Sequence, residues 1–399
     1  MVDLKKIDRM FFVSWIPLSN KIKKDFYFAE LESMGISIVF CEISRCFSMG
    51  EPMKEGKDVN NEIYFFNNWI EFDSFLQEEV NENSLFVPLI SCIGKTIRLF
   101  RLFTKHKCQL CIFCRDMNPT FRSRDNYIGG KASFIIKLLT SKTGWFRLCE
   151  YINNASVTYY KKFNIIKGYD VVFESGFLGR FGIGIIGPKE FENAQIIEVN
   201  SSNYERAMAV QSSTVKRQRY ILFIDQYYPL HPDAGIAKYP PISSESYYKN
   251  LNSYFSRIEQ KFKMPVIIAA HPKAERYKTE DFFCNREVYF DKTEELCSGA
   301  NIVLTHGSTA VSYAIFFNKR VHMLSFKELY EKRIYSHLYT TSLADLIGCN
   351  WQFFDDDSDI NVIETINVER YRHYKYNYLT SPESENKRSI DIIRNAFGR

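Results

Sequence analysis

Apolar segments of strand length alternate with amphipathic segments of helical length, and they do so twice along this chain. The first round runs from FFVSWIPL, residues 11–18, to YDVVFE, residues 169–174, and the second from YILFID, residues 220–225, to RVHMLS, residues 320–325. Such alternation predicts parallel sheets covered by helices. Because 399 residues exceed what one hydrophobic core supports, we predict two Rossmann-like, doubly wound α/β domains facing each other across a cleft.

Clusters of Gly, Pro and Asn, which favour turns and loops, indicate the expected domain boundaries. The segment IIGPKEFENAQIIEVNSSN is the main cluster of these residues between the two rounds. We therefore place the first domain at 1–190, a linker at 191–218 and the second domain at 219–399. The last helical pattern, SIDIIRNAFG, is expected to cross back onto the first domain.

Composition and charge exclude several classes of protein. Hydrophobic residues make up 45% and charged residues 25% of the chain, and the net charge is +5. A charge this small, spread along the chain, argues against dedicated nucleic-acid binding. Basic clusters at 21–24 and 98–107 are either solvated helix faces or contacts to an anionic membrane surface. With no secretory signal and no long apolar run, we expect a cytoplasmic protein, either free or at the cytoplasmic face of the inner membrane.

No metal site is predicted. Cys108, Cys111 and Cys114 have the CxxCxxC spacing found around metals, but a second cysteine or histidine pair at suitable spacing is absent. The compact apolar run LCIFC favours a buried strand instead. The acidic run at 355–359 lies in a polar stretch, without a strand-like context and without partner histidines. We interpret it as a solvated loop.

The segment VIIAAHPK is the first of three strand ends that carry polar residues. Five apolar residues predict a buried strand, which ends at His271 and Pro272, with Lys273 following. Proline cannot extend the sheet, so the imidazole is held at the carboxyl edge, where ligands bind. A histidine at that edge can donate a hydrogen bond to a phosphate or protonate a leaving group.

The segment NIVLTHGSTA is the second strand end. A predicted strand ends near His306 and Gly307, and Ser308 or Thr309 is expected to open the next helix. Such residues ordinarily cap a helix, but the amides and hydroxyls of a helix start also bind anions. Together with the neighbouring histidine strand, this segment predicts a phosphate site.

The segment YILFIDQYYPLHPD is the third strand end. Asp225 follows the strand that opens the second domain, and it either binds a ribose hydroxyl or caps the turn. A second His-Pro pair, His231 and Pro232, follows a loop and not a strand, so it is the weaker candidate of the two.

In the first domain, the predicted strand YDVVF brings Glu174 to a turn made by Ser175 and Gly176. An acid on one wall of a cleft, with a histidine and a phosphate site on the other, suits group transfer. The carboxylate would remove a proton from an attacking hydroxyl, and the opposite wall would stabilise a departing phosphate.

These segments resemble the motifs of a known enzyme group. The segment FESGFLGRFGIG, residues 173–184, resembles the acid-x-Gly segment of bacterial capsular polysaccharide Kdo transferases and the corresponding motif of bacterial sialyltransferases. The segment AAHPK is similar to the His-Pro motif of the same enzymes and HGSTA to their Ser/Thr motif, in the same order along the chain. The resemblance covers mainly residues 170–325.

The resemblance implies a GT-B fold and an inverting, metal-independent glycosyltransferase. It implies a CMP-activated 2-keto sugar acid such as Kdo, sialic acid or another nonulosonic acid as donor, a glycan or glycolipid acceptor bound by the first domain, and no cofactor. Glu174 would be the general base, and His271 the general acid or phosphate contact. The residues implied in nucleotide or phosphate binding are Pro272, Lys273, His306, Gly307, Ser308, Thr309 and Asp225, and those implied in sugar or acceptor binding are Gly176, Arg180 and Arg276.

Two departures from the resembled pattern matter. Ser175 stands where many relatives have a second acid, so Glu174 is the only candidate base in this segment. Gly179 displaces the expected arginine by one position, to Arg180. The alternatives are a UDP-sugar transferase, a polyol-phosphate transferase or an epimerase with two similar domains, and a non-catalytic protein of glycan assembly.

Overall fold

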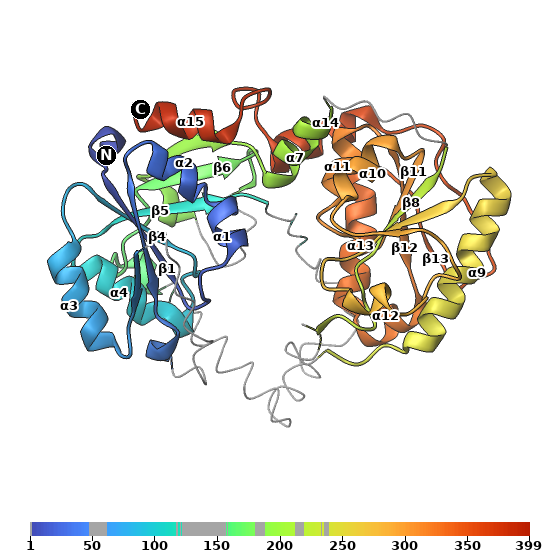
Figure 1. Cartoon of the computed structure of the whole chain (residues 1–399), viewed down its shortest axis with the longest axis horizontal. Helices are drawn as coiled ribbons and strands as arrows, with labels where there is room; N and C mark the ends of the chain where they lie inside the picture. The colour runs from blue at the N-terminus through green and yellow to red at the C-terminus, as the bar shows by residue number, and fades with distance from the viewer. Residues whose placement is uncertain are drawn as a thin grey trace. The chain divides into compact units, whose positions relative to one another are not determined.

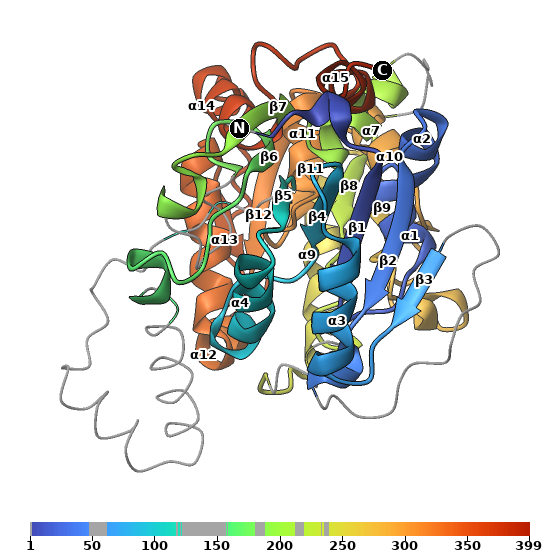
Figure 2. The ribbon, with the colours of Figure 1, turned by 90° about the vertical axis from the view of Figure 1, so that its left-hand side faces the viewer.

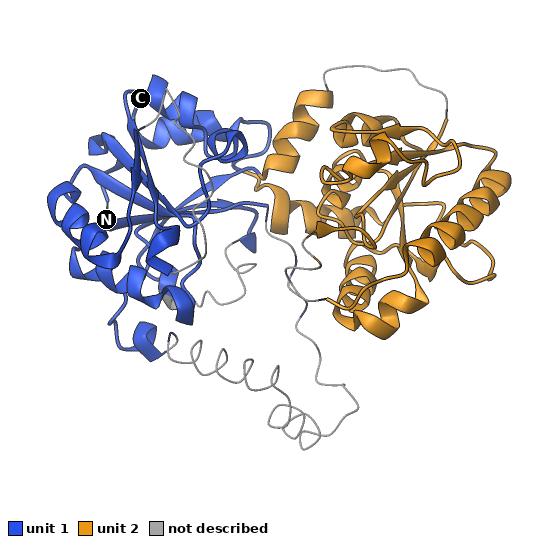
Figure 3. Cartoon of the chain, turned by 60° about the horizontal axis from the view of Figure 1, so that its bottom comes forward, with its two compact units in different colours: residues 1–200, 383–399 blue, residues 201–382 orange. Residues whose placement is uncertain are grey.

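The computed structural model describes residues 2–47, 62–116, 119, 121, 157, 159–179, 188–211, 219–232, 234 and 239–399. The chain divides into two compact units (Figure 3): unit 1 comprises residues 1–200 and 383–399, and unit 2 comprises residues 201–382.

Unit 1 is built on a parallel sheet of seven strands in the order β3-β2-β1-β4-β5-β6-β7. The strands β3, β2, β1 and β4 are seen side by side in Figure 2. Their bounds are β1 (Arg9–Ser14), β2 (Ser37–Glu42), β3 (Glu62–Phe65), β4 (Ser84–Pro88), β5 (Gln109–Cys114), β6 (Val171–Ser175) and β7 (Gln195–Val199).

Both faces of this sheet are buried, because alternate residues of each strand point to opposite sides. In β1, Phe11 and Val13 pack with one cluster, and Met10 and Phe12 with the other. Residues of α3 and α4 cover the first face, and residues of α2 and α15 cover the second (Figure 1). Among the described residues of unit 1, the helices with defined bounds include α1 (Asn20–Asp25), α2 (Phe28–Ser33), α3 (Trp69–Glu79), α4 (Ile97–Lys105) and α15 (Ser389–Ala396).

Unit 2 repeats this plan with six parallel strands in the order β10-β9-β8-β11-β12-β13. Numbered from the first strand of each unit, both sheets begin 3-2-1-4-5-6, which is the Rossmann order. The predicted fold class of two doubly wound α/β units is confirmed. The strands are β8 (Ile221–Ile224), β9 (Val266–Ala269), β10 (Val288–Tyr289), β11 (Ile302–Thr305), β12 (Arg320–Ser325) and β13 (Trp351–Phe353).

The longest helix of unit 2, α9, shows why its sequence is helical. The Ser243 hydroxyl accepts a hydrogen bond from the Ser246 amide and so caps the first turn. Tyr247, Leu251, Tyr254 and Ile258 recur every three or four residues and are buried against the sheet. In the part of unit 2 that the structure describes, the helices with defined bounds include α7 (Ser202–Gln211), α9 (Ser244–Phe262), α10 (Thr293–Gly299), α11 (Val311–Phe316), α12 (Lys327–Lys332), α13 (Ile334–Ile347) and α14 (Val368–Tyr374).

The segment that we expected as a linker contains regular structure. Strand β7 is the edge strand of the first sheet, and α7 packs against α10 and α11 of unit 2. The chain returns to unit 1 at its end, where Ile390, Ile393 and Phe397 join the buried cluster beneath α15. The Arg399 guanidinium donates hydrogen bonds to the carbonyls of Met34 and Ile7, at 3.0 and 3.1 Å.

The CxxCxxC segment forms β5 and the residue before it, as the buried-strand interpretation predicted. Cys108 and Cys114 lie in the cluster on one face of the sheet, and Cys111 lies in the cluster on the other. Their thiols therefore cannot converge on one ion. Burial raises the pKa of Cys108 to about 12 and raises that of Cys111 well above its ordinary value, so these thiols stay protonated.

The basic cluster at 98–107 lies on α4, whose Leu99, Phe100 and Phe103 are buried in the core. The apolar side chains of this helix thus pack inward. Among the described residues, no helix combines the length and apolarity needed to cross a membrane.

Candidate functional site

The Rossmann order marks one place in each sheet where ligands bind. Successive connections leave in opposite directions at β1 and β4 in unit 1, and at β8 and β11 in unit 2. The crevice outside the carboxyl ends of such strands is the usual ligand site.

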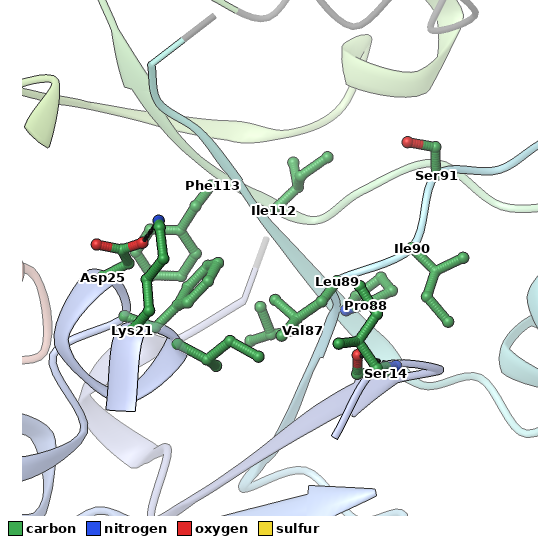
Figure 4. Close-up of a pocket in the computed structure, with 13 residues that line it drawn as sticks. Ser14, Lys21, Asp25, Val87, Pro88, Leu89, Ile90, Ser91, Ile112 and Phe113 are labelled. Atoms are coloured by element: carbon green, nitrogen blue, oxygen red, sulfur yellow. Dashed lines mark hydrogen bonds and ion pairs between the residues drawn. The ribbon is translucent and has the colours of Figure 1, made fainter. Parts of the chain in front are cut away.

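A pocket lies at this place in unit 1 (Figure 4). Its volume is about 340 Å³, and it is formed where β1 and β4 end, with residues of α1 and β5 completing it. Its lining is mostly apolar, which is typical of small-molecule sites. The lining residues are Ser14, Ile16, Lys21, Ile22, Asp25, Phe26, Val87, Pro88, Leu89, Ile90, Ser91, Ile112 and Phe113.

The polar groups of this pocket are few. Lys21 and Asp25 form an ion pair on α1, and Figure 4 shows the pair beside Phe113. The Ser14 hydroxyl accepts a hydrogen bond from the Ile16 amide at 2.9 Å. Sequence reasoning missed this pocket, because its lining comes from segments distant in sequence.

An aromatic stack joins the pocket to the neighbouring strand β6. The rings of Phe26 and Phe113 meet edge to face at 5.3 Å, and Phe113 stacks on Phe173 at 4.7 Å. Phe173 immediately precedes Glu174 in β6. The pocket and Glu174 therefore belong to the same carboxyl edge of the first sheet.

Glu174 is buried, with 3% of its surface exposed. The chain leaves β6 through Gly176, whose φ of 69° favours glycine. Gly179 then folds back over the acid. A Cβ atom at Gly179 would lie 2.9 Å from the Cys114 carbonyl oxygen and 3.2 Å from Glu174 Cγ. The glycine at 179 is therefore explained by close approach to the Glu174 side chain.

A second acid, Glu198, lies next to Glu174. The two residues are paired in the parallel register of β6 and β7, and neighbouring strands lie about 4.8 Å apart. Sequence reasoning looked for a second acid at position 175 and missed this one. Glu198 was missed because it lies in the segment IIEV, which was assigned to the linker.

In unit 2, His271 follows β9 and is half-buried, whereas Pro272 and Lys273 are exposed. The Lys273 amide donates a hydrogen bond to His271 Nδ1 at 3.2 Å. Because Nδ1 accepts, the neutral ring carries its proton on Nε2. Nε2 is thus the atom that can donate to a ligand.

His231, which follows β8, lies against His271. The two ring centroids are 4.8 Å apart, with an angle of 66° between the ring planes. Sequence reasoning gave His231 less weight because a loop separates it from its strand. The structure brings both His-Pro pairs together at the carboxyl edge of the second sheet.

The Asp225 carboxylate is buried beneath this edge. Its Oδ2 accepts a hydrogen bond from the Tyr277 hydroxyl at 3.0 Å. Burial raises the pKa of Asp225 to about 6, although the Tyr227 amide and the Tyr277 hydroxyl oppose the rise. The His271 amide also favours the carboxylate. Of the two roles expected for Asp225, this geometry favours holding the turns after β8 and β9 over binding a ribose.

His306 was predicted as a phosphate contact, but its side chain lies inside the core with no exposed surface. Nδ1 lies 2.8 Å from the Leu324 carbonyl oxygen and Nε2 lies 2.7 Å from the Tyr247 hydroxyl. Both ring nitrogens are therefore engaged. Burial lowers the pKa of His306 to about 4, so the ring is neutral. Gly307 follows with a φ of 110°.

Ser308 and Thr309 do not open the helix as expected. Helix α11 begins at Val311, has six residues and has no side-chain cap. The two residues form a turn before it, in which the Ser308 hydroxyl accepts a hydrogen bond from the Ala310 amide at 3.2 Å. Thr309 is exposed and Ser308 is half-buried. A helix this short provides no strong anion site of its own.

The two arginines predicted to bind sugar differ in status. The Arg276 guanidinium forms two hydrogen bonds with the Glu280 carboxylate, at 2.7 and 2.6 Å. This pairing raises the pKa of Arg276 and lowers that of Glu280. A sugar carboxylate would have to compete with Glu280. Arg180 lies outside the described residues.

No family model matches this chain, and no curated protein matches it in sequence. Among solved structures, the UDP-GlcNAc 2-epimerase from Methanocaldococcus jannaschii is 12% identical over 98% of this chain and 99% of that chain, with a TM-score of 0.43. A calicheamicin glycosyltransferase is 10% identical over 98% and 99%, with a TM-score of 0.44. MurG of Acinetobacter baumannii is 8% identical over 87% and 86%, with a TM-score of 0.41.

Proposed function

We propose that this chain is a glycosyltransferase that moves a 2-keto sugar acid, such as Kdo or another nonulosonic acid, from its CMP donor to a glycan or glycolipid acceptor. The observation that carries the proposal is the buried Glu174, enclosed by the turn of Gly176 and Gly179 at a strand end. It stands where the motif that this segment resembles has its general base.

Glu174 takes the proton of the acceptor hydroxyl as the acceptor oxygen bonds to the anomeric carbon. The bond from that carbon to the CMP phosphate oxygen breaks, and CMP leaves. A single displacement of this kind inverts the anomeric carbon. The buried carboxylate is held in place by its surroundings, as general-base catalysis requires.

Unit 2 binds the donor nucleotide. His271 donates from Nε2 to the phosphate oxygen that becomes the leaving group, because its Nδ1 is engaged by the Lys273 amide. Asp225 holds the turn that carries His271. Ser308 and Thr309 contribute through their exposed turn, not through a helix start.

Unit 1 binds the acceptor in the pocket at the ends of β1 and β4. The apolar lining suits the carbon face of a sugar or the apolar part of a glycolipid, and the Lys21–Asp25 pair offers hydrogen bonds to hydroxyls. Phe113 and Phe173 connect the pocket to the strand that carries Glu174.

The test is release of CMP from CMP-Kdo and from CMP-sialic acid in the presence of a glycan acceptor. Acceptor-dependent release from either donor supports the proposal. Release of UDP from a UDP-sugar, with none of CMP, would assign the chain to the UDP-sugar alternative. If no nucleotide is released from any donor and none is bound, the result would support the alternative of a non-catalytic protein of glycan assembly.

A further inference from the structure

A four-residue turn occurs twice in unit 2, and the proposed mechanism uses only one copy. Residues 231–234 read His-Pro-Asp-Ala and residues 271–274 read His-Pro-Lys-Ala. In each copy the alanine amide donates a hydrogen bond to the carbonyl of the histidine, at 3.0 Å for Ala234 and 2.9 Å for Ala274. The same hydrogen bond therefore joins the histidine and the alanine in both places.

The two turns follow neighbouring parallel strands, β8 and β9, in which Ile224 is paired with Ala269. The connections that carry them are held together. The ring of Tyr227, after β8, meets the ring of Tyr277, after β9, edge to face at 5.1 Å. The Tyr277 hydroxyl in turn bonds Asp225. The pairing of the turns is thus fixed by buried contacts beneath them.

The imidazoles of the two turns, His231 and His271, are half-buried and 4.8 Å apart between centroids. Two imidazoles at this distance repel one another when both are protonated. An anion that accepts a hydrogen bond from each ring removes that repulsion. Phosphate has several acceptor oxygens and can satisfy two donors at once.

We propose that His231 and His271 together form one binding site for the phosphate group of a nucleotide. This inference deepens the proposed function, because it rests on that function for the identity of the ligand as a nucleoside monophosphate ester. His231 is then a second phosphate contact, which the resembled motifs do not include. A metal ion is the less suitable occupant, because no group of three His, Cys, Asp or Glu converges among the described residues.

The experiment measures the affinity of the full chain for CMP, UDP and inorganic phosphate by calorimetry. The variants are His231→Gln, His271→Gln and the double variant, with His373→Gln as a matched control, since His373 is an exposed histidine of the same unit. Each single variant should weaken binding at least about tenfold. The fold loss of affinity in the double variant should be smaller than the product of the fold losses in the two single variants, because the two residues share one ligand.

Full affinity in His231→Gln, with loss in His271→Gln, would overturn the inference. Binding of Zn²⁺ by the wild type, with no binding of the three phosphate ligands, would also overturn it. If phosphate or UDP binding depends on both histidines but CMP-sugars are not turned over, the inference stands and the proposed function fails.

A second measurement covers the case in which a variant does not fold. The imidazole resonances of the wild-type chain are followed by NMR while inorganic phosphate is added. Shifts of two histidine signals, absent in the control titration with chloride, support the pair. A shift of one signal or of none contradicts it.

Discussion

Units 1 and 2 share one strand order, yet their carboxyl edges carry different chemistry. The edge of unit 1 has an apolar pocket and a buried glutamate, and the unit's single histidine, His106, lies between α4 and β5 and does not line the pocket. The edge of unit 2 has two histidines in contact above a buried aspartate. The fold therefore sets where a ligand binds, and the residues after each strand decide which ligand and which reaction.

The largest expected effect comes from removing the acid of unit 1. Glu174→Gln should lower the transfer rate by about a thousandfold while leaving the affinity for CMP unchanged, because the nucleotide binds unit 2. The measurement is acceptor-dependent CMP release alongside calorimetry. Glu198→Gln is the control, and its loss should be below about tenfold. Equal losses of transfer rate in the two variants would show that Glu174 is not the base on its own and that Glu174 and Glu198 act together.

The second effect separates the units by their response to acid. Burial lowers the pKa of His306 and of His322 to about 4. Below pH 6.5, these two imidazoles are therefore protonated in the unfolded chain but stay neutral in the folded chain until the pH approaches 4. The free energy of unfolding of unit 2 therefore falls as pH falls from 6.5 towards 4. Asp225, with its pKa raised to about 6, acts in the opposite direction and offsets part of the loss.

The net loss in unit 2 between pH 7 and pH 5 should be roughly 2 kcal/mol. Unit 1 lacks such histidines. There, hydrogen bonds from His106 and Lys105 lower the pKa of Asp73, so that contribution is lost only as pH falls below the ordinary range of an aspartate. Hydrogen exchange at both pH values should show amides of unit 2 losing protection first. Earlier loss in unit 1 would refute this assignment.

The third effect concerns the glycine that covers Glu174. Gly179→Ala should lower the free energy of unfolding by about 2 kcal/mol, because the new Cβ would press on the Cys114 carbonyl. Transfer should fall as the acid is displaced, with CMP affinity retained. Leu178→Ala in the same turn is the control. A Gly179→Ala variant with normal stability and normal transfer would show that the turn does not position the acid.

The smallest effect tests the pocket of unit 1. Ile16→Asp places a charge at its apolar lining and should raise the KM for the acceptor about fivefold to tenfold, without changing CMP affinity. Ile70→Asp is the matched control, because Ile70 is exposed on α3 and does not line the pocket. A weaker affinity for CMP in Ile16→Asp, at an unchanged acceptor KM, would contradict the division of ligands between the units.

Strong local patterns gave much of the fold. The strand-like segment predicted at residues 320–325 coincides with β12, because its apolar run is of strand length and almost all of it is buried. Strand β7 was missed because IIEV is short and stands among polar residues. The start of α11 was misplaced because Ser308 forms a turn of its own, which competes with a helix cap.

The site was less accessible from sequence, since it depends on contacts between distant segments. The sequence around His306 does not indicate that Tyr247 and Leu324 enclose its ring. Likewise, the sequence around Glu198 does not indicate that it lies in register with Glu174. His231 is different. The repeated His-Pro-x-Ala turn was visible in the sequence, and comparing its two copies would have drawn attention to it.

The most direct test of the central claim is calorimetric titration of the wild-type chain with CMP and with UDP under identical conditions. We predict that CMP binds at least about tenfold more tightly than UDP, a difference of about 1.4 kcal/mol, and that His271→Gln weakens the binding of CMP at least about tenfold. Tighter binding of UDP than of CMP would contradict it.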